Sequence, residues 1–168
     1  MKARLLVDAK CMLAEGIQWR PDLQRLWWSD IHGCALWSCD EDGGDAVQHQ
    51  TPERLGSFAF DLDGHLLCAF ESGLFRWDLD GDRLDRLTDF EPNHPTSRMN
   101  DGRCDRQGRF VAGGVNENGL KPTSSVIRYA AGRAKTVLSD IGCSNSICFS
   151  PNGQWMYFAD TPTGQIKR

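Results

Sequence analysis

The sequence of 168 residues lacks the features that mark several protein classes. None of its apolar runs approaches the roughly 20 residues of a transmembrane helix, so no membrane partner is expected. The net charge of −4, with arginine and lysine scattered along the chain, gives no electrostatic footprint for nucleic acid. There is no G-x-G-x-x-G or P-loop, and the four histidines show neither H-x-H nor H-x-x-x-H spacing. These absences leave a globular protein without a nucleotide motif or a histidine-rich metal motif.

The seven cysteines form no C-x-x-C pair and are odd in number. This pattern disfavours a disulfide framework or a zinc ribbon, and it favours free thiols that pack as small hydrophobic groups. The N-terminus begins like a signal peptide, but Asp8 and Lys10 interrupt the apolar run too early for a usable hydrophobic region. We therefore expect a soluble, cytoplasmic protein.

What the sequence does contain is an internal repeat. Each copy has a short apolar strand, a tight turn rich in Asp, Asn and Gly, and a second apolar strand, which is the pattern of a β-hairpin. The turn glycines Gly64, Gly108 and Gly153 are 44 and 45 residues apart. Glycine suits such turns because they need a positive φ. The copies are residues 17–30, 58–70, 102–113 and 147–160.

A third apolar strand follows each hairpin, and a fourth follows where the chain continues. Four antiparallel strands in each unit of about 40–45 residues predict a β-propeller. The chain would hold about three and a half four-stranded blades, with the last one ending inside its third strand. Because propellers close with typically 4–8 blades, we expect a fragment, and its open blade edges offer a route to self-association. The tryptophans are expected to pack between the blades.

The repeat also predicts a shared site. The residue four places before the apolar anchor of each hairpin is Glu15, Gly56, Asn100 or Asn145. Equivalent positions at the start of each innermost strand converge around a propeller axis, so three units would offer side-chain oxygens to one place. Carboxylate and amide oxygens suit a hard divalent cation such as Ca²⁺, Mg²⁺ or Mn²⁺. The alternative is that the asparagines cap turns and Glu15 is solvated.

Three ordered motifs resemble the SMP-30/gluconolactonase/LRE-like (regucalcin) family over essentially the whole chain. They are Leu13-Ala-Glu15-Gly16-x-x-Trp19, Arg98-x-Asn100-Asp101-Gly102 and Ser144-Asn145-x-x-x-Phe149-Ser150-Pro151-Asn152-Gly153. The resemblance implies that residues 1–168 are the N-terminal portion of a six-bladed propeller that hydrolyses sugar lactones with one divalent metal ion (Ca, Zn, Mn, Mg or Fe).

Carried over by motif, Glu15 and Asn145 would be metal ligands, and Arg98 and Asn100 would face the substrate. An acidic residue in a later loop of the family maps to Glu117, a third substrate contact. The chain departs from the family pattern at Ser146, where a glycine is usual. The resemblance places the general-base aspartate beyond residue 168, so the catalytic base is unknown here and we expect this chain alone to have low or no activity.

Two carboxylate-rich segments imitate metal loops. Asp61-Leu-Asp63-Gly64 and Asp78-Leu-Asp80-Gly-Asp82 lack the spacing and flanking helices of an EF-hand, so both are expected to be hairpin turns. Two other function classes stay open: a non-catalytic scaffold or calcium-binding propeller, and a metal-dependent esterase or organophosphate hydrolase.

Overall fold

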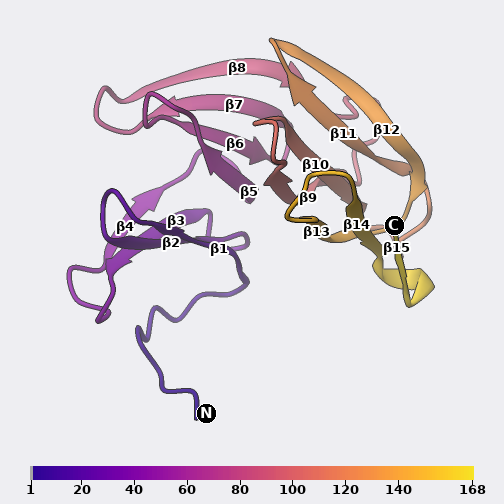
Figure 1. Ribbon diagram of the computed structural model, residues 1–168. Coiled ribbons are helices and arrows are strands. Elements are labelled where there is room, and N and C mark those ends of the chain that lie inside the picture. Colours follow the sequence, from indigo (N-terminus) through magenta and orange to yellow (C-terminus); the bar gives the residue numbers. More distant parts are fainter. Residues whose placement is uncertain (1) are drawn as a thin grey trace. The chain divides into compact units, whose positions relative to one another are not determined.

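A computed structural model describes residues 2–168, and it consists almost wholly of antiparallel sheets. The chain divides into two compact units, Met1–Leu55 and Gly56–Arg168. The first unit holds one four-stranded sheet with the order β1-β2-β3-β4 (Figure 1). Its strands are β1 (Ala14–Arg20), β2 (Arg25–Asp30), β3 (Ala35–Asp40) and β4 (Val47–Gln50).

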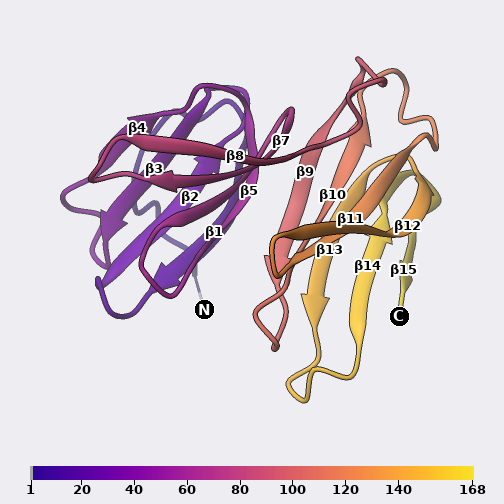
Figure 2. The ribbon, with the colours of Figure 1, turned by 90° about the horizontal axis from the view of Figure 1, so that it is seen from above.

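The second unit holds three sheets in sequence order, seen from above in Figure 2. The first comprises β5 (Leu55–Phe60), whose first residue belongs to the other unit, with β6 (Leu66–Phe70), β7 (Gly73–Asp78) and β8 (Arg83–Asp89). The next comprises β9 (Ser97–Cys104), β10 (Phe110–Asn116), β11 (Ser124–Ala130) and β12 (Arg133–Ile141). The last has three strands, β13 (Ser144–Phe149), β14 (Met156–Asp160) and β15 (Gln165–Lys167), with the short 3-10 helix η1 (Thr161–Thr163) between β14 and β15.

The hairpin turns that connect the first two strands of these three sheets are those expected from the repeat. Gly64, Gly108 and Gly153 have φ values of 89°, 75° and 67°. A residue with a β-carbon is disfavoured in this left-handed region. The predicted turn chemistry is therefore confirmed.

Strand β10 is buried at every position because sheets pack against both of its faces. Successive side chains of a strand point to opposite faces, and here the two faces belong to different cores. Phe110 and Ala112 pack with Leu74 and Met99 in one core. Val111 packs with Ile147 and other residues in the second core. Alternation therefore joins three sheets through a single strand.

Strands β9 and β13 lie side by side in the second unit, although they belong to different sheets (Figures 1 and 2). The backbone N–H of Ile147 donates to the Asp101 carboxylate at 2.7 Å. This charge-assisted bond fixes the middle of β13 against β9. It brings together two of the sequence motifs.

All seven cysteines are free thiols. Cys39 and Cys68 are fully buried, whereas Cys148 is exposed. Trp27, Trp28 and Trp77 are buried, as expected for core tryptophans. Trp19 and Trp155 differ from that expectation, because they lie near the tips of their hairpins and are 41% and 44% exposed. Among the described residues, no helix is long and apolar enough to cross a membrane.

Candidate active site

Arg98 is the centre of a polar cluster in the second unit. It lies on β9 with only 6% of its surface exposed. Its Nε donates to Oε1 of Glu117 at 2.8 Å, and its Nη1 donates to Oδ1 of Asn100 at 2.9 Å and to the Met99 carbonyl at 3.0 Å. A buried guanidinium is tolerated only when it is paired and hydrogen-bonded in this way. The structure thus joins all three residues that the sequence assigns to the substrate.

Asn100 connects this cluster to the predicted metal ligand of the next sheet. Its Nδ2 donates to the Ser144 carbonyl at 2.9 Å and to Oδ1 of Asn145 at 3.3 Å. The Nδ2 of Asn145 in turn donates to Oγ1 of Thr161 at 2.8 Å. A continuous chain of hydrogen bonds therefore runs from Arg98 through both asparagines to Thr161.

Glu117 reaches the cluster because the chain turns back immediately after β10. Its backbone N–H donates to the Thr96 carbonyl at 2.8 Å, which holds this turn against the segment that leads into β9. The Glu117 side chain is 36% exposed, so one end of the buried guanidinium pair opens to solvent. The sequence predicts Glu117 as a substrate contact, and the structure places it beside Arg98.

Glu15 lies in the other unit, on β1. Its side chain is exposed, and it makes no hydrogen bond to any described side chain or backbone group, although its backbone carbonyl accepts from the Ser29 hydroxyl at 3.3 Å. The carboxylate is therefore unengaged within its own unit. The structure brings together Arg98, Asn100, Glu117 and Asn145 within the second unit, whereas Glu15 belongs to the first unit.

Glu15 and Asn145 occupy the same local structure in their two sheets. In each case a β-bulge begins at the next residue, between Glu15 and Gln18 in one sheet and between Asn145 and Cys148 in the other. The first bulge residue is left-handed in both, with φ of 65° at Gly16 and 58° at Ser146. Bulges re-aim neighbouring side chains and are enriched next to active sites. Such a left-handed backbone favours glycine, which the chain has at Gly16 but not at Ser146.

A buried aspartate anchors the segment ahead of each bulge. The Asp30 carboxylate accepts backbone N–H groups from Met12, Leu13 and Gly33. Desolvation opposes its ionisation, but these donors outweigh that effect and hold the pKa of Asp30 below its usual value. The Asp160 carboxylate anchors the corresponding segment of its own sheet, where it accepts the backbone N–H groups of Gly142 at 3.1 Å and Cys143 at 2.8 Å.

These anchors were not among the candidate site residues, although the sequence carries a signal for them. Trp-Ser-Asp30 and Phe-Ala-Asp160 fall at the same place in the repeat. Their role becomes visible only when their hydrogen bonds are known.

The second repeat has Gly56 at the corresponding position and contributes no side chain. A β-carbon on Gly56 would lie 2.5 Å from the Met99 carbonyl oxygen and 2.7 Å from that of Asn100. Such distances are prohibitively short, so the glycine permits close approach of β5 to β9. Close packing therefore explains why the second repeat has no oxygen-bearing side chain at this position.

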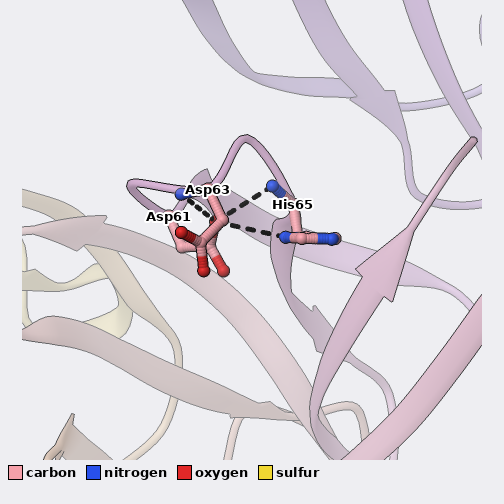
Figure 3. Close-up of side chains that lie close together, drawn as sticks. All are labelled: Asp61, Asp63 and His65. Atoms are coloured by element: carbon pink, nitrogen blue, oxygen red, sulfur yellow. Dashed lines mark hydrogen bonds and ion pairs between the residues drawn. The ribbon is translucent and has the colours of Figure 1, made fainter.

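Asp61, Asp63 and His65 form the one group of at least three His, Cys, Asp or Glu side chains in the described residues whose potential metal-ligating atoms all lie within 4.8 Å of one another (Figure 3). They lie on the turn between β5 and β6, where Oδ1 of Asp61 accepts the backbone N–H groups of Asp63 and His65. The guanidinium of Arg76 already binds all three, at 2.8 Å from Asp61, 3.0 Å from Asp63 and 2.8 Å from His65. The positive charge beside these carboxylates is therefore that of the Arg76 guanidinium. Both carboxylate-rich segments are hairpin turns, as predicted.

Comparison with known proteins gives a consistent result. The sequence profile of the SMP-30/gluconolactonase/LRE-like region matches residues 13–168. The chain is 37% identical to an L-arabinolactonase of Azospirillum brasilense, and the match covers 98% of this chain and 56% of the relative. It is 32% identical to a 6-deoxy-6-sulfogluconolactonase of Pseudomonas putida, covering 98% and 57%.

A solved structure of regucalcin from Agrobacterium tumefaciens, described as a calcium-binding protein, aligns with a TM-score of 0.87 at 29% identity. The alignment covers 93% of this chain and 53% of the regucalcin chain. The predicted fold class, an all-β propeller with about three and a half blades, is therefore confirmed. The chain spans a little over half the length of the relatives that it matches.

Proposed function

Because the chain belongs to the SMP-30/gluconolactonase/LRE-like family, we propose that it serves the hydrolysis of a sugar lactone with the help of a divalent metal ion. The observation that carries this proposal is the hydrogen-bonded chain from Arg98 through Asn100 to Asn145, with Glu117 at its start. It links the residues assigned to the substrate with a residue assigned to the metal. The lactonase names of the two relatives support the substrate class.

The charge balance of the cluster favours an uncharged, polyhydroxylated ligand. Arg98 and Glu117 neutralise each other at 2.8 Å, so the cluster does not attract an anion as an unpaired arginine would. The Nη2 group of Arg98 has no hydrogen-bond partner among residues 2–168 and remains free to donate to a lactone oxygen. The partly exposed Glu117 carboxylate would accept hydroxyl groups of the sugar. These groups would orient the ester for attack.

The proposed metal ligands fit a hard divalent ion. Within residues 2–168 the Glu15 carboxylate has no hydrogen-bond partner, and Oδ1 of Asn145 accepts one long hydrogen bond, at 3.3 Å, which leaves a lone pair for a cation. Oxygen donors of this kind suit Ca²⁺, Mg²⁺ or Mn²⁺. When bound, such an ion polarises the ester carbonyl and lowers the pKa of water. In the hydrolysis, water adds to the carbonyl carbon and the ring C–O bond breaks, which gives a hydroxy acid.

Ligand binding tests the substrate assignment independently of turnover. A sugar lactam, in which nitrogen replaces the ring oxygen, resists hydrolysis, and its binding is measured by saturation-transfer NMR. We expect Arg98→Met to abolish the signal, because the buried donor is lost. Arg103→Met is the matched control, since Arg103 is an exposed residue of the same strand and should leave binding unchanged. Equal binding by wild type and Arg98→Met would refute the assignment.

A further inference from the structure

The side-chain amide of Asn145 has two ends, and only one of them ligates a cation. The oxygen carries lone pairs, whereas the NH₂ group is a donor without acceptor capacity. The torsion that exchanges the two ends is broad and shallow. A metal site built on an asparagine therefore depends on neighbouring groups that hold the amide in one orientation.

The hydrogen bonds of Asn100 determine the orientation on one side. The Arg98 guanidinium only donates, so the Asn100 atom at 2.9 Å from it is Oδ1. The Ser144 backbone carbonyl only accepts, so the Asn100 atom at 2.9 Å from it is Nδ2. This same Nδ2 lies 3.3 Å from Asn145 and must face its oxygen. The NH₂ group of Asn145 is consequently on the opposite side.

Thr161 receives that NH₂ group, with Oγ1 at 2.8 Å from Nδ2 of Asn145. The one other neighbour of this nitrogen among the described residues is the Cys143 thiol at 3.5 Å, which is a weak acceptor. We propose that Thr161 is a positioning residue that keeps the amide oxygen of Asn145 directed toward the metal. The inference rests on the proposed role of Asn145 as a metal ligand.

The backbone holds Thr161 at this place. Its N–H donates to the Cys143 carbonyl at 2.9 Å, and the preceding Asp160 binds the N–H groups of Gly142 and Cys143. Thr161 also begins η1, whose next residue, Pro162, has a fixed φ. The segment that carries Asn145 and the segment that carries Thr161 are therefore fastened together two residues ahead of Asn145.

Loss of the Thr161 hydroxyl should weaken metal binding without unfolding the chain. Replacing an outer partner of a metal ligand typically costs about 10–100-fold in affinity. Thr161 is exposed, so water competes for its role and we expect the lower end, about tenfold. Thr161→Ser keeps the acceptor and should restore the affinity.

The test is a titration of the 168-residue chain with Mn²⁺, with free Mn²⁺ measured by electron paramagnetic resonance. We expect Thr161→Val to weaken binding and Thr161→Ser to match wild type. Thr163→Val is the matched control, because the Thr163 hydroxyl lies in the same turn but bonds to the Asp160 carbonyl. It should leave the affinity unchanged.

The double variant Thr161→Val/Asn145→Ala shows whether Thr161 acts through Asn145. We expect it to bind Mn²⁺ no more weakly than Asn145→Ala alone. Wild-type affinity in Thr161→Val, combined with loss in Asn145→Ala, would overturn the inference and leave the proposed metal ligand intact. An equal loss from Thr161→Val in both backgrounds would also overturn the inference. Unchanged affinity in Asn145→Ala would overturn the ligand assignment itself, and the inference with it.

Discussion

Ser146 carries a backbone strain that a single substitution should relieve. Its φ of 58° lies in the left-handed region, which costs a residue with a β-carbon about 1–2 kcal/mol. Glycine removes this cost but loses about 0.5–1 kcal/mol through its greater freedom in the unfolded chain. The Ser146 side chain is exposed and makes no hydrogen bond within the described chain, so little else is lost. Ser146→Gly should therefore stabilise its unit by about 0.5–1 kcal/mol.

Differential scanning calorimetry measures this gain. For a protein of this size 1 kcal/mol corresponds to about 2–4 °C, so we expect Tm to rise by about 1–4 °C. Gly16 has a φ of 65° at the equivalent bulge, which makes Gly16→Ser the reverse experiment. It should lower the Tm of the first unit by a similar amount. A fall in Tm for Ser146→Gly, or an unchanged Tm in both variants, would refute the argument that the backbone is strained at Ser146.

Three further predictions concern other groups of the chain. Asp30→Asn should lower the free energy of unfolding at pH 7 by about 1–2 kcal/mol through loss of charge-assisted bonds. Because the folded pKa of Asp30 is depressed, its contribution to stability is present above about pH 4 and is lost as the pH falls through the folded pKa. Urea titrations at several pH values should therefore show a weaker acid dependence of stability for the variant, and an acid dependence equal to that of the wild type would contradict this role. Asp63→Asn should leave Mn²⁺ affinity unchanged, because Arg76 already occupies its cluster, and weaker Mn²⁺ binding would show that a metal displaces the guanidinium. Burial raises the pKa of the Cys68 thiol, so mass spectrometry after iodoacetamide treatment should find the exposed Cys148 alkylated and Cys68 intact, whereas equal labelling would indicate an open fold.

The repeat in the sequence predicts most of the fold because its signals are local. Alternating apolar residues identify the strands, and turn glycines such as Gly64 and Gly108 identify the hairpins. The third strand expected after each hairpin is present, as β3 shows in the first sheet and β7 in the second. Hairpins pair neighbours along the chain, so a sheet follows directly from the order of its strands.

The site was predictable in residue type but not in its connections. Aligning the repeats identifies Asn100 and Asn145, yet the hydrogen bond between them depends on how two sheets pack. The anchoring role of Asp160 depends on the backbone donors that its carboxylate meets. The left-handed φ of Ser146 arises from a bulge that periodicity does not reveal. Non-local contacts of this kind carry no signature in a single sequence.

The most direct test of the proposed function is lactone hydrolysis by a chimera. Residues 1–168 would replace the matching region of the Azospirillum brasilense L-arabinolactonase, which is 37% identical and extends beyond the match. The chimera would be stripped of metal and then titrated with Ca²⁺, Mn²⁺, Zn²⁺ and Fe²⁺, with the uncatalysed lactone background subtracted. We predict metal-restored turnover that Asn145→Ala and Arg98→Met each reduce at least a hundredfold, about 2.7 kcal/mol of transition-state stabilisation. A folded chimera that hydrolyses no sugar lactone above background with any of these metals would contradict the proposal.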